Sequence, residues 1–158
     1  MLTAFNAECD LYNLKFIEIS ALVQSLFLLF SGEYSFQNIS IEKSQISETF
    51  SAEKVILVHI HNVLVIGAGV NRFLKIFRSG DVVIKNVDFS FINDPGPLIN
   101  SQIVRSFLLQ SFFFKNINAL INEVFKILID LKKIENISFY NLTFNNITFF
   151  KGIVINIY

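Results

Sequence analysis

The sequence has little cysteine, little histidine and no net charge. It contains one cysteine (Cys9), two histidines and no tryptophan, and its 13 lysines and arginines balance 13 aspartates and glutamates. One cysteine excludes an internal disulfide and a cysteine-only zinc cluster. Because no basic excess is present to neutralise phosphates, we expect no nucleic-acid partner. Two histidines leave little material for a metal enzyme, and no cofactor is expected.

Long hydrophobic runs are also lacking, although 53 % of the residues are apolar. A membrane-spanning helix needs about 20 mostly apolar residues. The longest run without a charged residue, 55–71, is shorter than this and contains both histidines. The apolar stretch 19–32 resembles the core of a secretion signal, but it begins too late and follows an acidic segment. The composition therefore predicts one folded domain over residues 1–158 and no transmembrane helix.

What the chain does contain is asparagine at near-constant intervals. Six asparagines are each followed at once by an aliphatic residue and have apolar residues at alternate positions before them. The steps between them are 25, 24, 24, 30 and 25 residues. The six are Asn13, Asn38, Asn62, Asn86, Asn116 and Asn141. Self-similarity at such a fixed period predicts a solenoid of stacked coils.

Apolar residues alternate with polar ones on both sides of each asparagine, which is typical of strands with one buried face. The alternation loses one residue of phase at the asparagine, so both flanks face one core only if the chain bends there. Asparagine is the non-glycine residue best able to adopt a left-handed conformation at a bend. Its amide both donates and accepts, so stacked copies can form hydrogen bonds along the stack. We therefore expect three short strands in each coil.

With this repeat the sequence resembles the right-handed parallel β-helices of the pectin-lyase-like type, which carry an asparagine ladder at a tight turn. Its richness in Asn, Ile and Phe also resembles β-helix segments of large predicted surface proteins of ciliate protists. The resemblance implies an all-β, right-handed parallel β-helix of about six coils, with the six asparagines as buried ladder positions. A local helix over residues 120–132 is the alternative for that window, because its apolar residues also fall at helical spacing.

The interval after Asn86 is longer than its neighbours and contains both prolines of the chain. Proline cannot donate to a strand ladder, so this segment is expected to leave the sheet as a loop. Insertions in repeat folds often form the binding face. The candidate binding loop consists of Asn93, Asp94, Pro95, Gly96 and Pro97.

Neither end of the sequence shows a capping helix. Solenoids need polar caps because an open last coil exposes sheet edges and core. We therefore expect a segment of a longer solenoid, or ends covered by end-to-end self-association.

Two sets of outward side chains are candidates for chemistry. Lys75, Arg105 and Asp130 each lie eleven residues before an asparagine, so they are expected to stack as a basic strip ending in an acid. Such a strip could act on an acidic sugar. His59 and His61 lie two apart on a strand and face the same way, which makes them weak candidates for metal ligands. No third ligand is evident in the neighbouring coils.

The preferred function is a non-enzymatic β-solenoid scaffold or binding module, with a protein or a glycan as partner. The parent protein is expected to be extracellular or membrane-anchored. One alternative is a carbohydrate-active β-helix enzyme, lyase or hydrolase, that uses Lys75, Arg105 and Asp130. Another is a small assembly subunit that packs through its open ends.

Overall fold

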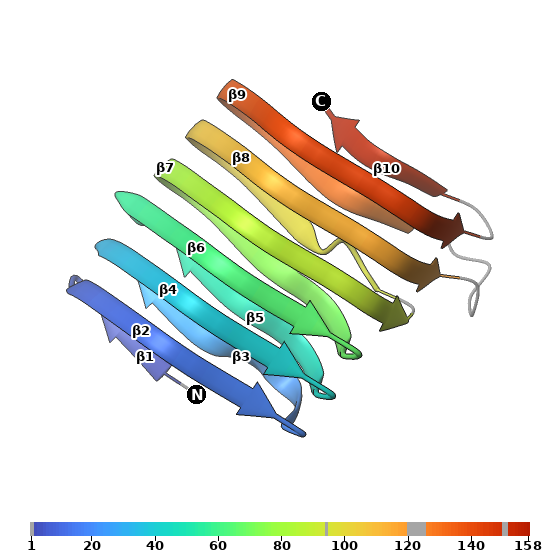
Figure 1. Cartoon of the computed structure of the whole chain (residues 1–158). Helices are drawn as coiled ribbons and strands as arrows, with labels where there is room; N and C mark the ends of the chain where they lie inside the picture. The colour runs from blue at the N-terminus through green and yellow to red at the C-terminus, as the bar shows by residue number, and fades with distance from the viewer. Residues whose placement is uncertain (1, 94, 120–125, 150–151) are drawn as a thin grey trace.

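The computed structural model describes residues 2–93, 95–119, 126–149 and 152–158. The chain forms ten strands that wind into a parallel β-solenoid of about six coils (Figure 1). The strands are β1 (Leu2–Phe5), β2 (Glu8–Ile17), β3 (Ser20–Phe30), β4 (Glu33–Glu42), β5 (Gln45–Glu53), β6 (Leu57–Ile66), β7 (Gly69–Asn93), β8 (Ile99–Ala119), β9 (Lys126–Phe149) and β10 (Gly152–Ile157). No stretch that the structure describes forms a helix of the length and apolarity needed to cross a bilayer.

Every strand pair is parallel, and each coil stacks on the one before it in register. β2 lies beside β4, β4 beside β6, and β6 beside the second half of β7. β1, β3, β5 and the first half of β7 form the matching series on another side of the coil. From β7 onward a single long strand runs around the coil, and β8 pairs with β7 and β9 along most of its length.

Each coil turns at three corners, and each corner is marked by a residue with positive φ. The strand register aligns these residues in three columns of six. The first corner has Asn13, Asn38, Asn62, Asn86, Ser111 and Asn141; the second has Glu18, Lys43, Gly67, Phe91, Asn116 and Asn146; the third has Asn6, Ser31, Lys54, Arg78, Ile103 and Lys133. The left-handed residue turns the chain and shifts the alternation, so that all three sides face one core. The predicted three-sided coil is confirmed.

The core consists of aliphatic and phenylalanine side chains stacked from coil to coil. Phe27 stacks on Phe50 with ring centroids 4.9 Å apart, and Phe114 stacks on Phe144 at the same distance. Such pairs add about 0.5–1.5 kcal/mol beyond the burial of their area. The inward residue of each alternating pair therefore holds the coils together, and the outward residue is free for other roles.

The long interval after Asn86 has a different origin from the one predicted. The register aligns Asn86 with Ser111, 25 residues further on, so the coil that contains the prolines has ordinary length. The step from Ser111 to Asn141 is 30 residues, which places the extra length after the second corner of that coil. This interval includes residues 120–125, which lie outside the described residues. From Lys126 onward the window predicted as an alternative helix is strand.

Candidate binding site

Four asparagines form a hydrogen-bonded row on the outside of the first corner. Nδ2 of Asn38 donates to Oδ1 of Asn13 at 2.9 Å, Asn62 donates to Asn38 at 3.0 Å, and Asn86 donates to Asn62 at 3.1 Å. All four side chains are exposed, so the prediction of buried ladder amides is wrong. The reason is geometric, because the left-handed corner residue points outward while its aliphatic neighbour turns into the core. The ladder is therefore a surface feature.

Asn116 does not belong to this row. Ser111 occupies the first corner of that coil, and Asn116 lies at the second corner, where its Oδ1 accepts a 2.7 Å hydrogen bond from Nδ2 of Asn146. Asn141 lies at the first corner, next to Ser111, as predicted. The two corners are five residues apart in every coil. An asparagine at either corner therefore gives nearly the same sequence pattern.

The structure separates the three predicted catalytic residues. Lys75 and Asp130 lie in one outward column with Asn100 between them. Asp130 is 7 % exposed and accepts a hydrogen bond from Nδ2 of Asn156 at 2.9 Å. Nζ of Lys132 lies 3.6 Å from the same carboxylate. Asp130 is therefore held by its own neighbours, and Lys75 is not its partner.

Arg105 lies past the third corner and pairs with Asp81. Its Nε donates to Oδ1 of Asp81 at 2.9 Å, and its second nitrogen donates to the other carboxylate oxygen. The guanidinium holds the pKa of Asp81 below its ordinary value through this hydrogen bond, and the carboxylate raises the pKa of Arg105 in turn. The prediction that Arg105 stacks between Lys75 and Asp130 is wrong, because the coil interval was assigned to the wrong segment.

His59 and His61 face outward from β6, and their rings are nearly parallel with centroids 6.3 Å apart. Nδ2 of Asn86 lies 2.7 Å from Nε2 of His61 and donates to it. Nε2 of His59 is buried without a hydrogen-bond partner, and burial lowers the pKa of this ring, followed by the charge of Lys85 and then His61. Among residues 2–93, 95–119, 126–149 and 152–158, no group of three or more His, Cys, Asp or Glu is placed to hold a metal ion.

The proline segment leaves the strands, as predicted, but it packs closely against the preceding coil. Pro95 is buried. A Cβ at Gly96 would overlap Oδ1 of Asn71 and lie 2.9 Å from its backbone oxygen, so only glycine fits this approach. Asp94 lies outside the described residues. Of the predicted loop, Asn93 alone lines a hollow among those that the structure describes there.

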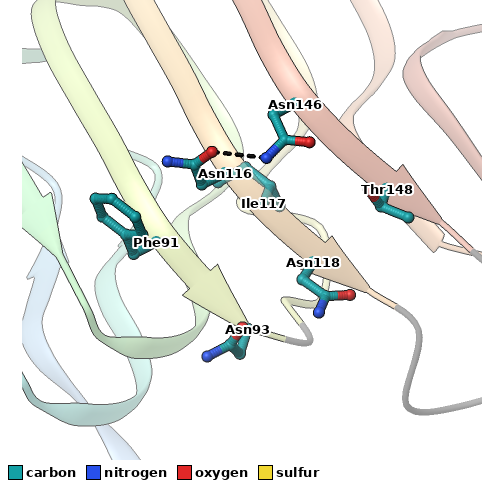
Figure 2. A pocket seen from close by; sticks show the side chains of 7 residues that line it. All are labelled: Phe91, Asn93, Asn116, Ile117, Asn118, Asn146 and Thr148. Carbon is teal, nitrogen blue, oxygen red and sulfur yellow. Dashed lines mark hydrogen bonds between the residues drawn. The ribbon is translucent and has the colours of Figure 1, made fainter.

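This hollow, of about 410 Å³, lies just beyond the second corner on the outside of β7, β8 and β9 (Figure 2). Its floor is the solenoid surface and its lining is uncharged. The lining residues are Phe91, Asn93, Asn116, Ile117, Asn118, Asn146 and Thr148. We call it the amide hollow. Sequence reasoning missed it, because Phe91 follows Phe89 at the two-residue spacing of a core strand.

The amide hollow exists because the sheet continues past the second corner in these coils. Ile92 pairs with Ile117, and Asn93 pairs with Asn118. In earlier coils the strand breaks at the same place, for example at Ala68. The side chains on either side of the buried Ile92 column then project outward in two rows across three strands.

Phe91 is an unusual residue for its position. Its φ is +59°, which for a bulky side chain costs roughly 1–2 kcal/mol relative to ordinary strand geometry. Its ring is 56 % exposed, although Phe89, two residues earlier, is fully buried. Glycine stands at the same corner one coil earlier, at Gly67, and asparagine one coil later. Neither backbone preference nor burial explains a phenylalanine here.

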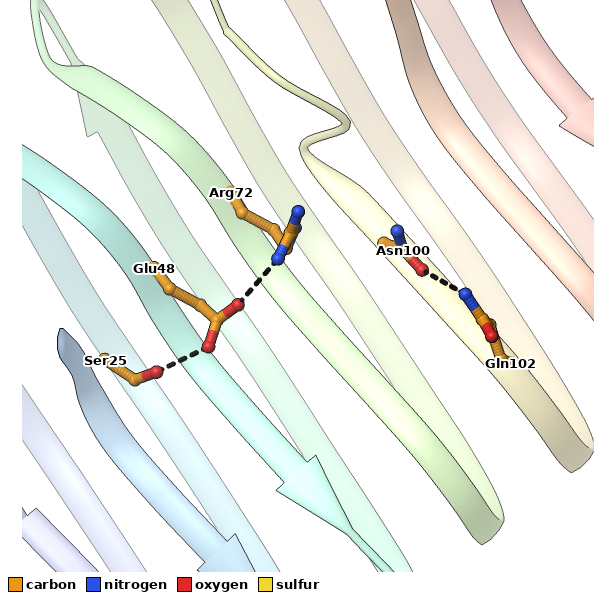
Figure 3. Close-up of polar contacts among 5 residues, drawn as sticks. All are labelled: Ser25, Glu48, Arg72, Asn100 and Gln102. Carbon is orange, nitrogen blue, oxygen red and sulfur yellow. Dashed lines mark hydrogen bonds and ion pairs between the residues drawn. The ribbon is translucent and has the colours of Figure 1, made fainter. Parts of the chain in front are cut away.

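A second polar cluster lies on the side between the second and third corners (Figure 3). The Glu48 carboxylate accepts hydrogen bonds from Oγ of Ser25 and, at 3.0 Å, from Nη1 of Arg72. The Glu48 side chain is 13 % exposed and that of Arg72 is 27 % exposed. The cluster is closed on itself and offers no open carboxylate to a ligand.

Comparisons with models of protein families, with curated proteins and with solved structures gave no match. What the chain does is therefore argued from its solenoid geometry and from the chemistry of its outward side chains.

Proposed function

We propose that this chain is a non-enzymatic β-solenoid scaffold or binding module, part of an extracellular or membrane-anchored protein. The observation that supports the proposal is the three-column corner geometry, which keeps every outward side chain in a straight column. Columns at strand spacing, about 4.8 Å, present a fixed pattern of groups to a partner without prior ordering. The apolar inward columns keep that surface stiff.

The outward polar groups that were candidates for catalysis are paired within the chain. Arg105 is engaged by Asp81, and Asp130 by Lys132 and Asn156. Glycoside hydrolysis needs two carboxylates facing one bond, one of them able to give a proton. Asp130 has no second carboxylate in its column, where the neighbours are Asn100 and Asn156.

A carbohydrate-active enzyme of the pectin-lyase-like type is the second candidate. One observation favours it, since Lys75 and Asp130 do share an outward column, as the sequence predicted. The exposed asparagine row speaks against that likeness, because the resemblance implied buried amides.

The test is to incubate the chain with uronic and neutral polysaccharides and to follow both retention on the polymer and product formation. Retention without product is the result expected of a binding module. Product formed by the wild type and abolished in Asp130→Asn, but retained in Asp88→Asn, would replace the proposal with the enzyme. Asp88 is the matched control because it is an outward aspartate on another side of the coil, bonded locally to Ser90.

A further inference from the structure

We infer that the amide hollow binds a neutral oligosaccharide, with Phe91 as the stacking platform and the surrounding amides as hydroxyl partners. The inference rests on the proposed binding function and names its ligand. Three independent features carry it: the chemistry of the lining, the conformation of Phe91 and the arrangement of the two rows.

The lining side chains match the hydrogen-bonding character of sugar hydroxyls. A hydroxyl both donates and accepts, and so does a carboxamide. The bond from Asn146 to Asn116 uses one hydrogen of the first amide and the oxygen of the second. It leaves Nδ2 of Asn116 on the side of Phe91 and Oδ1 of Asn146 on the side of Thr148 (Figure 2). The pair is thus oriented to offer a donor at one end and an acceptor at the other.

The two rows have the dimensions of a short oligosaccharide site. Phe91, Asn116 and Asn146 lie in register across three strands, and Asn93, Asn118 and Thr148 lie in register two residues further on. Three strands span about 10 Å between the outer two, and two residues along a strand span roughly 7 Å. This area accommodates two pyranose rings, one over Phe91 and one over the amides.

Phe91 supplies the apolar contact that a sugar ring needs. An exposed aromatic ring in a left-handed conformation is costly to the fold, and such outliers persist where they serve a function. The axial C–H face of a pyranose can bury its apolar area on an aromatic ring without requiring charge. Ile103 is also an exposed apolar residue with positive φ, but it does not line this hollow.

The same lining disfavours other classes of ligand. An acidic glycan or a nucleic acid would need lysine or arginine, and none of the seven lining residues is charged. A peptide bound by strand addition would need a free edge, but β8, at the centre of the hollow, is paired on both sides. An apolar side chain would find only Phe91, because Ile117 is 1 % exposed.

The experiment is an NMR titration of the full chain with cellobiose, maltose and N,N′-diacetylchitobiose, with digalacturonate as the acidic comparison. At least one neutral disaccharide is expected to shift the side-chain amide signals of Asn93 and Asn118. Phe91→Asn is expected to weaken that binding by about tenfold or more, the loss of one stacking contact. Phe113→Ala is the matched control, because Phe113 is a similarly exposed ring on β8 outside the hollow, and it should change binding less than about twofold.

Phe91→Asn is also expected to raise the melting temperature, since asparagine already stands at this corner in the next two coils. A variant that is more stable but binds less cannot be explained by unfolding. Asn118→Ala, on an exposed strand position, gives a second loss of binding that does not involve the corner.

Three results would overturn the inference: no neutral disaccharide binds, binding survives Phe91→Asn, or digalacturonate binds equally well. Each leaves the scaffold proposal standing if a polymer is still retained. Conversion of the disaccharide during the titration would instead refute the non-enzymatic proposal, so the two failures are distinguishable.

Discussion

Ser111 lies in register beside Asn86 at the first corner, where each of the other five coils carries asparagine. Its hydroxyl is too short to continue the amide row from Asn86 to Asn141. The hydrogen-bonded row at this corner therefore runs from Asn13 to Asn86, and Ser111 separates it from Asn141.

Replacing Ser111 with asparagine should extend the row. The new amide would donate to Oδ1 of Asn86 and accept from Asn141, and asparagine tolerates the left-handed corner better than serine. We expect Ser111→Asn to raise the free energy of unfolding by about 1 kcal/mol, measured by urea denaturation. Ser106→Asn, an outward substitution away from the corners, is the control. A gain no larger than in the control would contradict a stabilising ladder.

The contribution of the ladder can be separated into hydrogen bonding and backbone conformation at Asn62. Asn62→Gly loses both amide bonds but keeps the left-handed conformation, and it should cost about 1 kcal/mol. Asn62→Ala also strains the corner and should cost about 1 kcal/mol more. Because the row is exposed, the freed amides of Asn38 and Asn86 can bind water, which keeps both losses small. Equal losses in the two variants would show that the conformation contributes nothing.

The coil was predictable from sequence because period-two alternation and a phase shift at asparagine are both local signals. The direction of the asparagine side chain was not predictable. A left-handed residue is compatible with an inward or an outward amide, and only the packing of Leu14 and its equivalents inside decides between them. The assignment of Asn116 failed for a related reason, since two corners five residues apart share one pattern.

The amide hollow shows a second limit of sequence reasoning. Phe89 and Phe91 have the spacing of two core residues, yet the left-handed turn at Phe91 reverses its direction and places Ile92 inside instead. The available signal was the alignment of Phe91 with Asn116 and Asn146. That alignment requires the correct coil interval, which the displaced extra residues concealed.

The cluster of Ser25, Glu48 and Arg72 should contribute more to stability than the exposed pair of Asp81 and Arg105. Arg72→Met leaves the Glu48 carboxylate, 13 % exposed, with a serine partner only. We expect a loss of about 1–3 kcal/mol in the free energy of unfolding, partly recovered when Glu48→Gln is added.

Urea denaturation of the single and double variants gives the coupling energy of the pair. Arg105→Met is the control, and it should change stability much less because water already solvates both partners. A coupling energy near zero for Glu48 and Arg72 would show that the desolvation of the pair cancels its attraction.

His59 should make the stability of the protein depend on pH in the mildly acidic range. Burial, then Lys85, then His61 lower its pKa from the ordinary 6.5, so the unfolded chain takes up a proton before the folded protein does. Stability is therefore expected to fall as pH decreases below about 6.5, until the folded ring also becomes protonated. The lowered pKa values of Glu42 and Asp81 act in a separate window, because their ordinary values are 4.5 and 3.8.

The measurement is the urea midpoint between pH 8 and pH 5 for wild type, His59→Gln and Lys85→Gln. His59→Gln should remove most of the slope, whereas Lys85→Gln removes the second contributor and should only reduce it. His59 faces Ser35 and Val83 in the neighbouring coils, and neither titrates, so no other register neighbour can produce the same slope. An unchanged slope in His59→Gln would mean that the unpartnered Nε2 is not the group through which acid acts on this side of the solenoid.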